Sequence, residues 1–147
     1  MRILGLDVGA KTIGVAVSDP FGWTAQGLAT VFRRSLAKDL AAVCSYIRDY
    51  EATEVVVGLP LNMNGSRGPS AAAAEQFADA IKKAAQAEGL TITVTMRDER
   101  LSTVAAQRVL LEGDVSRRSR KQVIDKMASV LILQCHLDYL RQSNNDR

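Results

Sequence analysis

The chain has 147 residues and a mass of 15.9 kDa, with 47% hydrophobic and 24% charged residues, which fits one domain, expected over residues 1–141, followed by a polar tail over 142–147. No apolar run could cross a bilayer and no signal-peptide pattern precedes the first strand, so we expect a cytoplasmic protein with no membrane partner. The net charge of +3 permits a polyanionic partner without requiring one.

The first patterned stretch is a predicted β-hairpin. Ile3–Val8 is a nearly continuous apolar run, typical of a buried strand, and Ile13–Val17 supplies a second strand after a tight turn. Asp7 lies inside the first run, where a carboxylate is costly to desolvate. It either caps the turn, a common structural role for Asp, or faces a cleft and holds a cation.

The middle of the chain alternates strands with helices. Gly27–Phe32 is predicted to be a weaker strand, and Ser35 is expected to cap a helix that runs to about Tyr50. Glu54–Leu59 follows as a buried strand, which suggests a parallel crossover. The expected inward face of the helix is Leu36, Leu40, Val43 and Ile47.

A loop of turn formers and amides over residues 60–69 follows that strand, where open α/β sheets tend to bind ligands. An alanine-rich helix is predicted over Ala71–Glu88, with Phe77 and Ile81 inward, and a strand over Leu90–Met96. A helix over Thr103–Leu111 and a final helix over Gln122–Arg141 complete the predicted elements.

The cysteines, the single histidine and the aromatic residues are placed outside the candidate site. Cys44 and Cys135 show no metal-ligand spacing and are expected to be buried free thiols. His136, the only histidine, lies about 15 Å by helical rise beyond Asp125, so we place it outside any site built around that acid. Among the aromatic residues, Trp23 in its glycine-flanked loop is the one expected to be exposed.

Three carboxylates lie at the ends of hydrophobic elements: Asp7, Glu99 and Asp125. Singly, Glu99 could form a surface salt bridge and Asp125 could offset a helix dipole. Together, they could meet at one edge of a sheet, where clustered carboxylates are expected to bind Mg²⁺ or Mn²⁺. Such a site could hydrolyse a phosphodiester.

Cations near these acids predict contact with a nucleic-acid backbone. Four of them fall in six positions just before the last predicted helix, one turn from Asp125. The candidate nucleic-acid-binding residues are Lys11, Arg100, Arg117, Arg118, Arg120 and Lys121.

Four blocks of the sequence resemble the signature blocks of the YqgF, or RuvX, family, in family order and across nearly the whole chain. They are Leu4–Asp19, Val57–Gly65, Asp98–Thr103 and Ile124–Leu133. The resemblance implies a ribonuclease H-like α/β fold: a five-stranded mixed sheet in the order 3-2-1-4-5, its first three strands antiparallel, with helices on both faces. It also implies that Asp7, Glu99 and Asp125 are catalytic.

The resemblance further implies a metal-dependent endonuclease that processes the 5′ end of pre-16S ribosomal RNA. Two residues depart from the family pattern. Thr12 stands where an arginine is usual, which weakens any role of the turn in gripping phosphate, and Ser129 replaces an alanine.

Three alternatives stay open at this point. The chain could be a Holliday junction resolvase that cuts branched DNA, or a non-catalytic assembly factor that binds nucleic acid through its basic surface. Residues 7–12 also resemble the phosphate loop of actin-like ATPases, although such enzymes need two such domains and the chain is short for that. The apolar last helix leaves a homodimer open.

Overall fold

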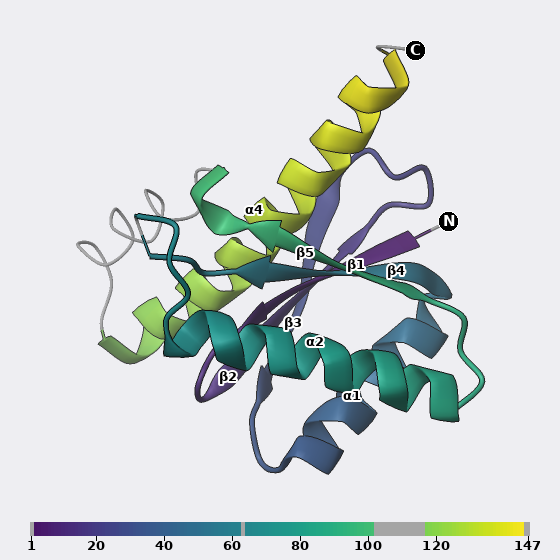
Figure 1. Ribbon diagram of the computed structural model, residues 1–147. Helices are drawn as coiled ribbons and strands as arrows, with labels where there is room; N and C mark the ends of the chain where they lie inside the picture. Colours follow the sequence, from purple (N-terminus) through teal and green to yellow (C-terminus); the bar gives the residue numbers. More distant parts are fainter. Residues whose placement is uncertain (1, 63, 102–116, 146–147) are drawn as a thin grey trace.

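The computed structural model describes residues 2–62, 64–101 and 117–145, with side chains described except at 101, 117–126 and 144–145 (Figure 1). A five-stranded sheet has the order β3-β2-β1-β4-β5, as the family resemblance implies. The strands are β1 (Arg2–Val8), β2 (Thr12–Ser18), β3 (Ala25–Phe32), β4 (Ala52–Leu59) and β5 (Thr93–Asp98). No helix in the described ranges is both long and apolar enough to cross a membrane.

Both antiparallel and parallel pairs build the sheet. β1, β2 and β3 pair antiparallel, whereas β4 is parallel to both β1 and β5. The hairpin between β1 and β2 closes where the Gly9 amide donates to the Thr12 carbonyl at 2.8 Å. Because β1, β4 and β5 run the same way, their carboxyl ends meet at one edge of the sheet.

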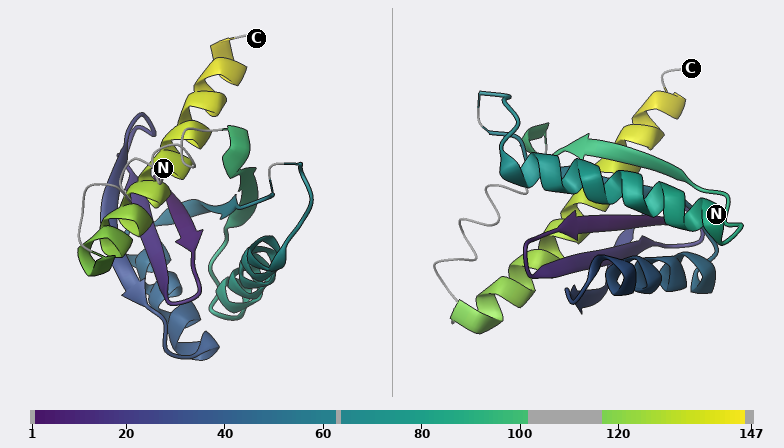
Figure 2. Two further views of the ribbon diagram at one scale, coloured as in Figure 1. Left: turned by 90° about the vertical axis from the view of Figure 1, so that its left-hand side faces the viewer. Right: turned by 60° about the horizontal axis from the view of Figure 1, so that its bottom comes forward.

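The helices cover both faces of the sheet (Figure 2). α1 (Leu36–Asp49) and α2 (Pro69–Ala87) pack on one face, where Val43, Ile47, Phe77 and Ile81 join the larger core. α4 (Arg117–Asn145) crosses the other face and buries Ile132, Leu133 and Leu137 against the sheet. The predicted inward positions Phe77 and Ile81 are thus confirmed.

α1 confirms its predicted cap and corrects its predicted face. The Ser35 hydroxyl accepts from the Lys38 amide at 3.2 Å, as an N-cap does. Leu36, however, is 54% exposed, so its predicted burial is wrong. Asp39 occupies the inward position of the first turn instead, because Arg33 pairs with its carboxylate at 3.1 Å.

α4 is longer than predicted at both ends. It begins at Arg117 rather than Gln122, because arginine and lysine are good helix formers and nothing between them breaks a helix. It continues to Asn145 rather than Arg141, since neither glycine nor proline follows. The helix predicted over Thr103–Leu111 lies outside the described residues. A short 3₁₀ turn, Glu99–Leu101, was not predicted.

Both cysteines are free, with Cys44 buried and Cys135 half-buried. Burial, and then the nearby Glu88, raise the pKa of the Cys44 thiol to about 11. The thiol therefore stays protonated at neutral pH, where it packs as a small apolar group rather than acting as a nucleophile.

α4 approaches β1 closely at Gly5. A Cβ atom built on Gly5 would lie 2.7 Å from the Leu133 Cβ and 3.1 Å from the Ser129 carbonyl oxygen. Any side chain at this position would push the helix away from the sheet. Gly5 therefore fixes the distance between α4 and β1.

A polar network joins the far half of α4 to β4 and β5. The Arg97 guanidinium donates to His136 Nδ1 at 2.6 Å, and His136 Nε2 lies 3.2 Å from a Glu54 carboxylate oxygen. Because Arg97 can only donate, Nδ1 must accept, so the imidazole is neutral and its Nε2–H donates to Glu54. Thr95 donates to the other Glu54 oxygen at 2.7 Å.

This network gives His136 a structural role at the interface of α4 with the sheet, where it is only 3% exposed. Arg97 also stacks on the Tyr139 ring, with its guanidinium carbon 4.5 Å from the ring centre.

We predict that His136→Ala lowers the free energy of unfolding by about 2 to 4 kcal/mol, because it leaves Arg97 and Glu54 without their shared partner in a partly buried site. Urea denaturation would measure the loss. Asp138→Ala is the matched control on the same helix, since its pair with Arg141 is exposed and should cost under about 1 kcal/mol. Equal losses in the two variants would contradict the structural role of the network.

Candidate active site

Asp7 lies near the carboxyl end of β1 and is only 6% exposed. Side chains alternate along a strand, so Asp7 shares the face of Gly5, which is the face that α4 covers. Its neighbour on β2 is Gly14, which has no side chain to fill the space beside the carboxylate. Asp7 is therefore held on the α4 face, beside a residue that has no side chain.

Glu99 follows β5 directly, in the 3₁₀ turn, and is 8% exposed. Its side chain reaches across β4: a Cβ built on Gly58 would lie only 2.8 Å from Glu99 Oε1. Since Leu6 pairs with Val57 across β1 and β4, Gly58 is the next residue beside Asp7. Strands lie about 5 Å apart, so the Glu99 carboxylate lies roughly one strand spacing from β1.

Asp98 and Arg100 form a pair beside Glu99. The Arg100 guanidinium donates to Asp98 Oδ2 at 2.9 Å, and this hydrogen bonding lowers the pKa of Asp98 and raises the pKa of Arg100. The loop after β4 lies against the same guanidinium, because a Cβ on Gly65 would be 3.3 Å from Arg100 Nη1. Arg100, predicted to contact nucleic acid, is thus also engaged with Asp98.

Of the remaining predicted site residues, the side chain of Lys11 is described and the others are not. Lys11 is exposed in the turn between β1 and β2. The backbone of α4 is described at Asp125, but the Asp125 side chain lies outside the described residues, as do the side chains of Arg117, Arg118, Arg120 and Lys121. The structure therefore brings Asp7 and Glu99 together and leaves the position of the Asp125 carboxylate open.

One residue at the site edge was missed from the sequence. Arg33 donates through Nη1 to the Gly9 carbonyl at 3.0 Å and through Nε to Asp39 at 3.1 Å, and its guanidinium stacks on Phe77. It thereby ties the turn after Asp7 to α1 and α2. The only signal in the sequence is an arginine followed six residues later by an acid in the first turn of a predicted helix.

The donors present suit a hard divalent cation. Asp7 and Glu99 offer carboxylate oxygens, the ligands preferred by Mg²⁺ and Mn²⁺, and both are nearly buried on one face. Among the residues with described side chains, no three His, Cys, Asp or Glu gather into a metal-binding cluster. A third ligand would have to come from outside those side chains, where Asp125 is the predicted candidate.

Solved structures share the fold. RuvC of T. thermophilus in complex with a Holliday junction substrate matches with a TM-score of 0.61 and 16% identity, over 97% of this chain and 96% of that one. The Holliday junction resolvase of fowlpox virus matches with a TM-score of 0.53 and 17% identity, over 97% and 99%. At such identities, the likeness concerns the fold, which is that of ribonuclease H-like nucleases.

Sequence relatives match over almost the entire chain. A protein of Moorella thermoacetica named "Putative pre-16S rRNA nuclease" is 60% identical over 143 residues, which cover 97% of this chain and 99% of the relative. A protein of the same name from Myxococcus xanthus is 56% identical, over 99% and 93%. The family model described as RuvX, Holliday junction resolvase, matches residues 1–139. The fold, the acids at one sheet edge and these matches agree: the chain belongs to the RuvX family.

Proposed function

We propose that this protein is a divalent-metal-dependent endonuclease that hydrolyses phosphodiester bonds in RNA and processes the 5′ end of pre-16S ribosomal RNA. The observation that carries this proposal is the Glu99 carboxylate lying over Gly58, beside the strand that holds Asp7. The names of the close relatives support the substrate.

Asp7, Glu99 and Asp125 are the proposed metal ligands and catalytic residues. The course of α4 supports the third. Leu133 and Ser129 lie against Gly5, while Leu137 joins the cluster that contains Ile3. The helix therefore runs along β1 in the opposite direction to the strand. Asp125 lies one turn before Ser129, or about 6 Å by helical rise, so its backbone lies toward the level of Asp7.

Three groups of cations would hold the RNA backbone. Lys11 lies in the turn that follows β1, and Arg100 lies beside the loop after β4. The basic segment that opens α4 contributes Arg117, Arg118, Arg120 and Lys121. Contacts of this kind position a strand without reading its sequence.

A bound Mg²⁺ or Mn²⁺ would supply a Lewis acid for the phosphate and lower the pKa of a water. The protein's own part is to hold two carboxylates close together at a nearly buried edge of the sheet. Without a bound cation, these two carboxylates would repel each other. Gly58 lets the Glu99 carboxylate lie directly over β4. The Arg33 contact to Gly9 ties the turn that follows Asp7 to the rest of the protein.

A second candidate is the cleavage of branched DNA. Two observations favour it: the description of the matching family and the TM-score of 0.61 to a RuvC bound to a Holliday junction. The two candidates share one active site and differ in substrate, so the same variants can be tested on a pre-16S RNA end and on a four-way DNA junction.

We predict that Asp7→Asn slows cleavage of a pre-16S RNA end in Mn²⁺ by about 10³-fold or more, equivalent to about 4 kcal/mol of transition-state stabilisation. The substitution keeps the shape of the side chain and removes the charge that would bind the cation. Activity of the unmodified protein should also vanish with a chelator. Cleavage that persists in the presence of chelator, or in the Asp7→Asn variant, would exclude this mechanism. If the protein cut only the four-way junction and not the RNA, its substrate would be branched DNA.

We predict that Gly58→Ala raises the Mn²⁺ concentration needed for half-maximal cleavage by about tenfold, because the new methyl group would displace the Glu99 carboxylate. It should also cost about 1 to 3 kcal/mol of stability through its clash with Ile132.

Ala78→Val is the matched control. Ala78 lies on α2 and is buried in the core on the opposite face of the sheet from Asp7 and Glu99, so overpacking it should lower the stability to a similar degree and leave the Mn²⁺ requirement unchanged. The same Mn²⁺ requirement in both variants would contradict the placement of Glu99 as a ligand.

We predict that replacing Arg117, Arg118, Arg120 and Lys121 with alanine lowers the salt dependence of RNA binding. Each lost contact to a single strand removes about 0.7 from the slope of log K against log salt, so four contacts should remove about 2.8. Fluorescence anisotropy across a salt series would measure the slope. An unchanged slope would show that this segment does not touch phosphate.

A further inference from the structure

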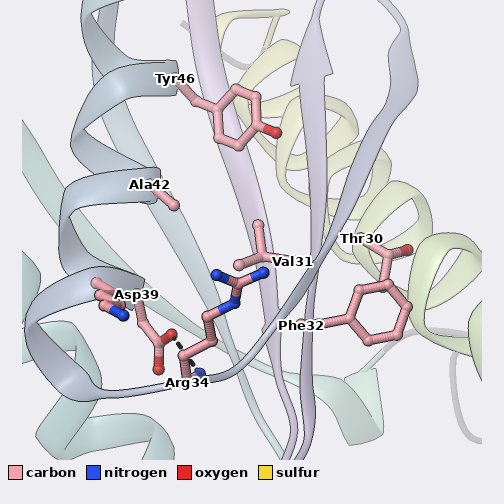
Figure 3. A pocket seen from close by; sticks show the side chains of 8 residues that line it. Thr30, Val31, Phe32, Arg34, Asp39, Ala42 and Tyr46 are labelled. Atoms are coloured by element: carbon pink, nitrogen blue, oxygen red, sulfur yellow. Dashed lines mark hydrogen bonds between the residues drawn. The ribbon is translucent and has the colours of Figure 1, made fainter.

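A second basic surface lies on the other side of the site from β5. A groove of about 380 Å³ runs between β3, at the edge of the sheet, and α1 (Figure 3). Arg34 and Lys38 line it, and both are exposed. In Figure 3 the Arg34 side chain extends between Val31 of β3 and the helix, toward Tyr46.

Within the described ranges, neither of the two cations in this groove, Arg34 and Lys38, forms an ion pair with an acid. The one carboxylate in the groove, Asp39, is only 3% exposed, and it accepts hydrogen bonds from Arg33 Nε and the Arg34 amide. Its charge is balanced by Arg33, so the groove presents a net positive surface.

The groove is also close to the proposed active site. Asp7 pairs with Gly14, and Gly14 pairs with Thr30, which lines the groove. Two strand spacings separate Asp7 from Thr30, or about 10 Å. At the same end of these strands, Lys11 is exposed in the hairpin turn, and its carbonyl accepts from the Arg33 amide at 2.9 Å. Positive groups thus continue from the site to the groove.

An aromatic ring stands at the margin of the groove. Phe32 lines it and is 58% exposed. The Phe32 ring projects from the side of β3 opposite Val31, whereas the Arg34 side chain lies on the Val31 side (Figure 3). A single strand that crosses this edge of the sheet would place a base on the ring and phosphates on the cations. A duplex would keep its bases stacked inside and could not use the ring.

We propose that the groove between β3 and α1 binds the single-stranded segment of the substrate that flanks the phosphate at Asp7, with Arg34 and Lys38 on its phosphates and Phe32 on a base. This inference rests on the proposed nuclease function for the identity of the strand. It adds a binding surface on β3 and α1, which none of the predicted site residues belongs to.

The test measures binding of a fluorescent RNA with a single-stranded flank to full-length protein carrying Asp7→Asn, so that binding is read without cleavage. Adding Arg34→Ala and Lys38→Ala should weaken binding about tenfold and lower the salt slope by about 1.4, the value for two phosphate contacts. Phe32→Leu should weaken binding to the flanked RNA and leave a blunt duplex unaffected.

Lys82→Ala with Lys83→Ala is the matched control, because both lysines are exposed in the second half of α2 and the pair removes the same charge. It should change binding less than about twofold. Equal weakening by the two double variants, an unchanged salt slope, or an effect confined to the blunt duplex would overturn the proposal.

Cleavage by the protein with Asp7 intact is measured in parallel, which separates this inference from the nuclease proposal. If that protein cuts RNA and the Arg34 and Lys38 variant binds and cuts equally well, the proposal that the groove binds RNA is wrong and the nuclease proposal is kept. If nothing is cut in Mn²⁺ but the groove variant still loses binding to the flanked RNA, the groove stands as a strand-binding surface and the nuclease falls.

Discussion

The close approach of α4 to the sheet is the constraint on which the rest of the structure depends. This approach is possible because Gly5 and Gly58 present no side chains to the helix, so Leu133 and Ile132 pack directly against the backbone of β1 and β4. The same missing side chain at Gly58 makes the space for the Glu99 carboxylate. Packing and the candidate chemistry therefore share one physical cause, and neither can be changed at this position without the other.

The strands and the cap of α1 could be predicted from the sequence because their signals are local and strong. Apolar runs gave the strands, Ser35 gave a helix cap, and the position of Asp7 inside an apolar run marked it as unusual. The exposure of Trp23, at 62%, was likewise predicted from its glycine-flanked loop, but Phe21 in the same loop is 82% exposed. The prediction that Trp23 is the one exposed aromatic residue is therefore wrong. The family resemblance supplied the strand order, which periodicity alone does not determine.

What could not be predicted depends on partners that are distant in the sequence. Asp39 is buried only because Arg33 neutralises it, and a helical pattern shows an acid there as solvent-facing. His136 meets Glu54, 82 positions earlier, and Arg97, 39 positions earlier, and no spacing rule links such residues. Glu99 was identified, but its reach across β4 to Gly58 follows from tertiary packing alone.

The contact at Gly5 also fixes the middle of α4 against the sheet. The helix is one continuous rod of 29 residues, pressed to the sheet near its middle, and its C-terminal end projects past the strands (Figure 2). A second attachment lies toward the C-terminal end, where the His136 network joins α4 to β4 and β5. The helix is therefore fixed to the sheet at two separate places, one by apolar contact and one by hydrogen bonds.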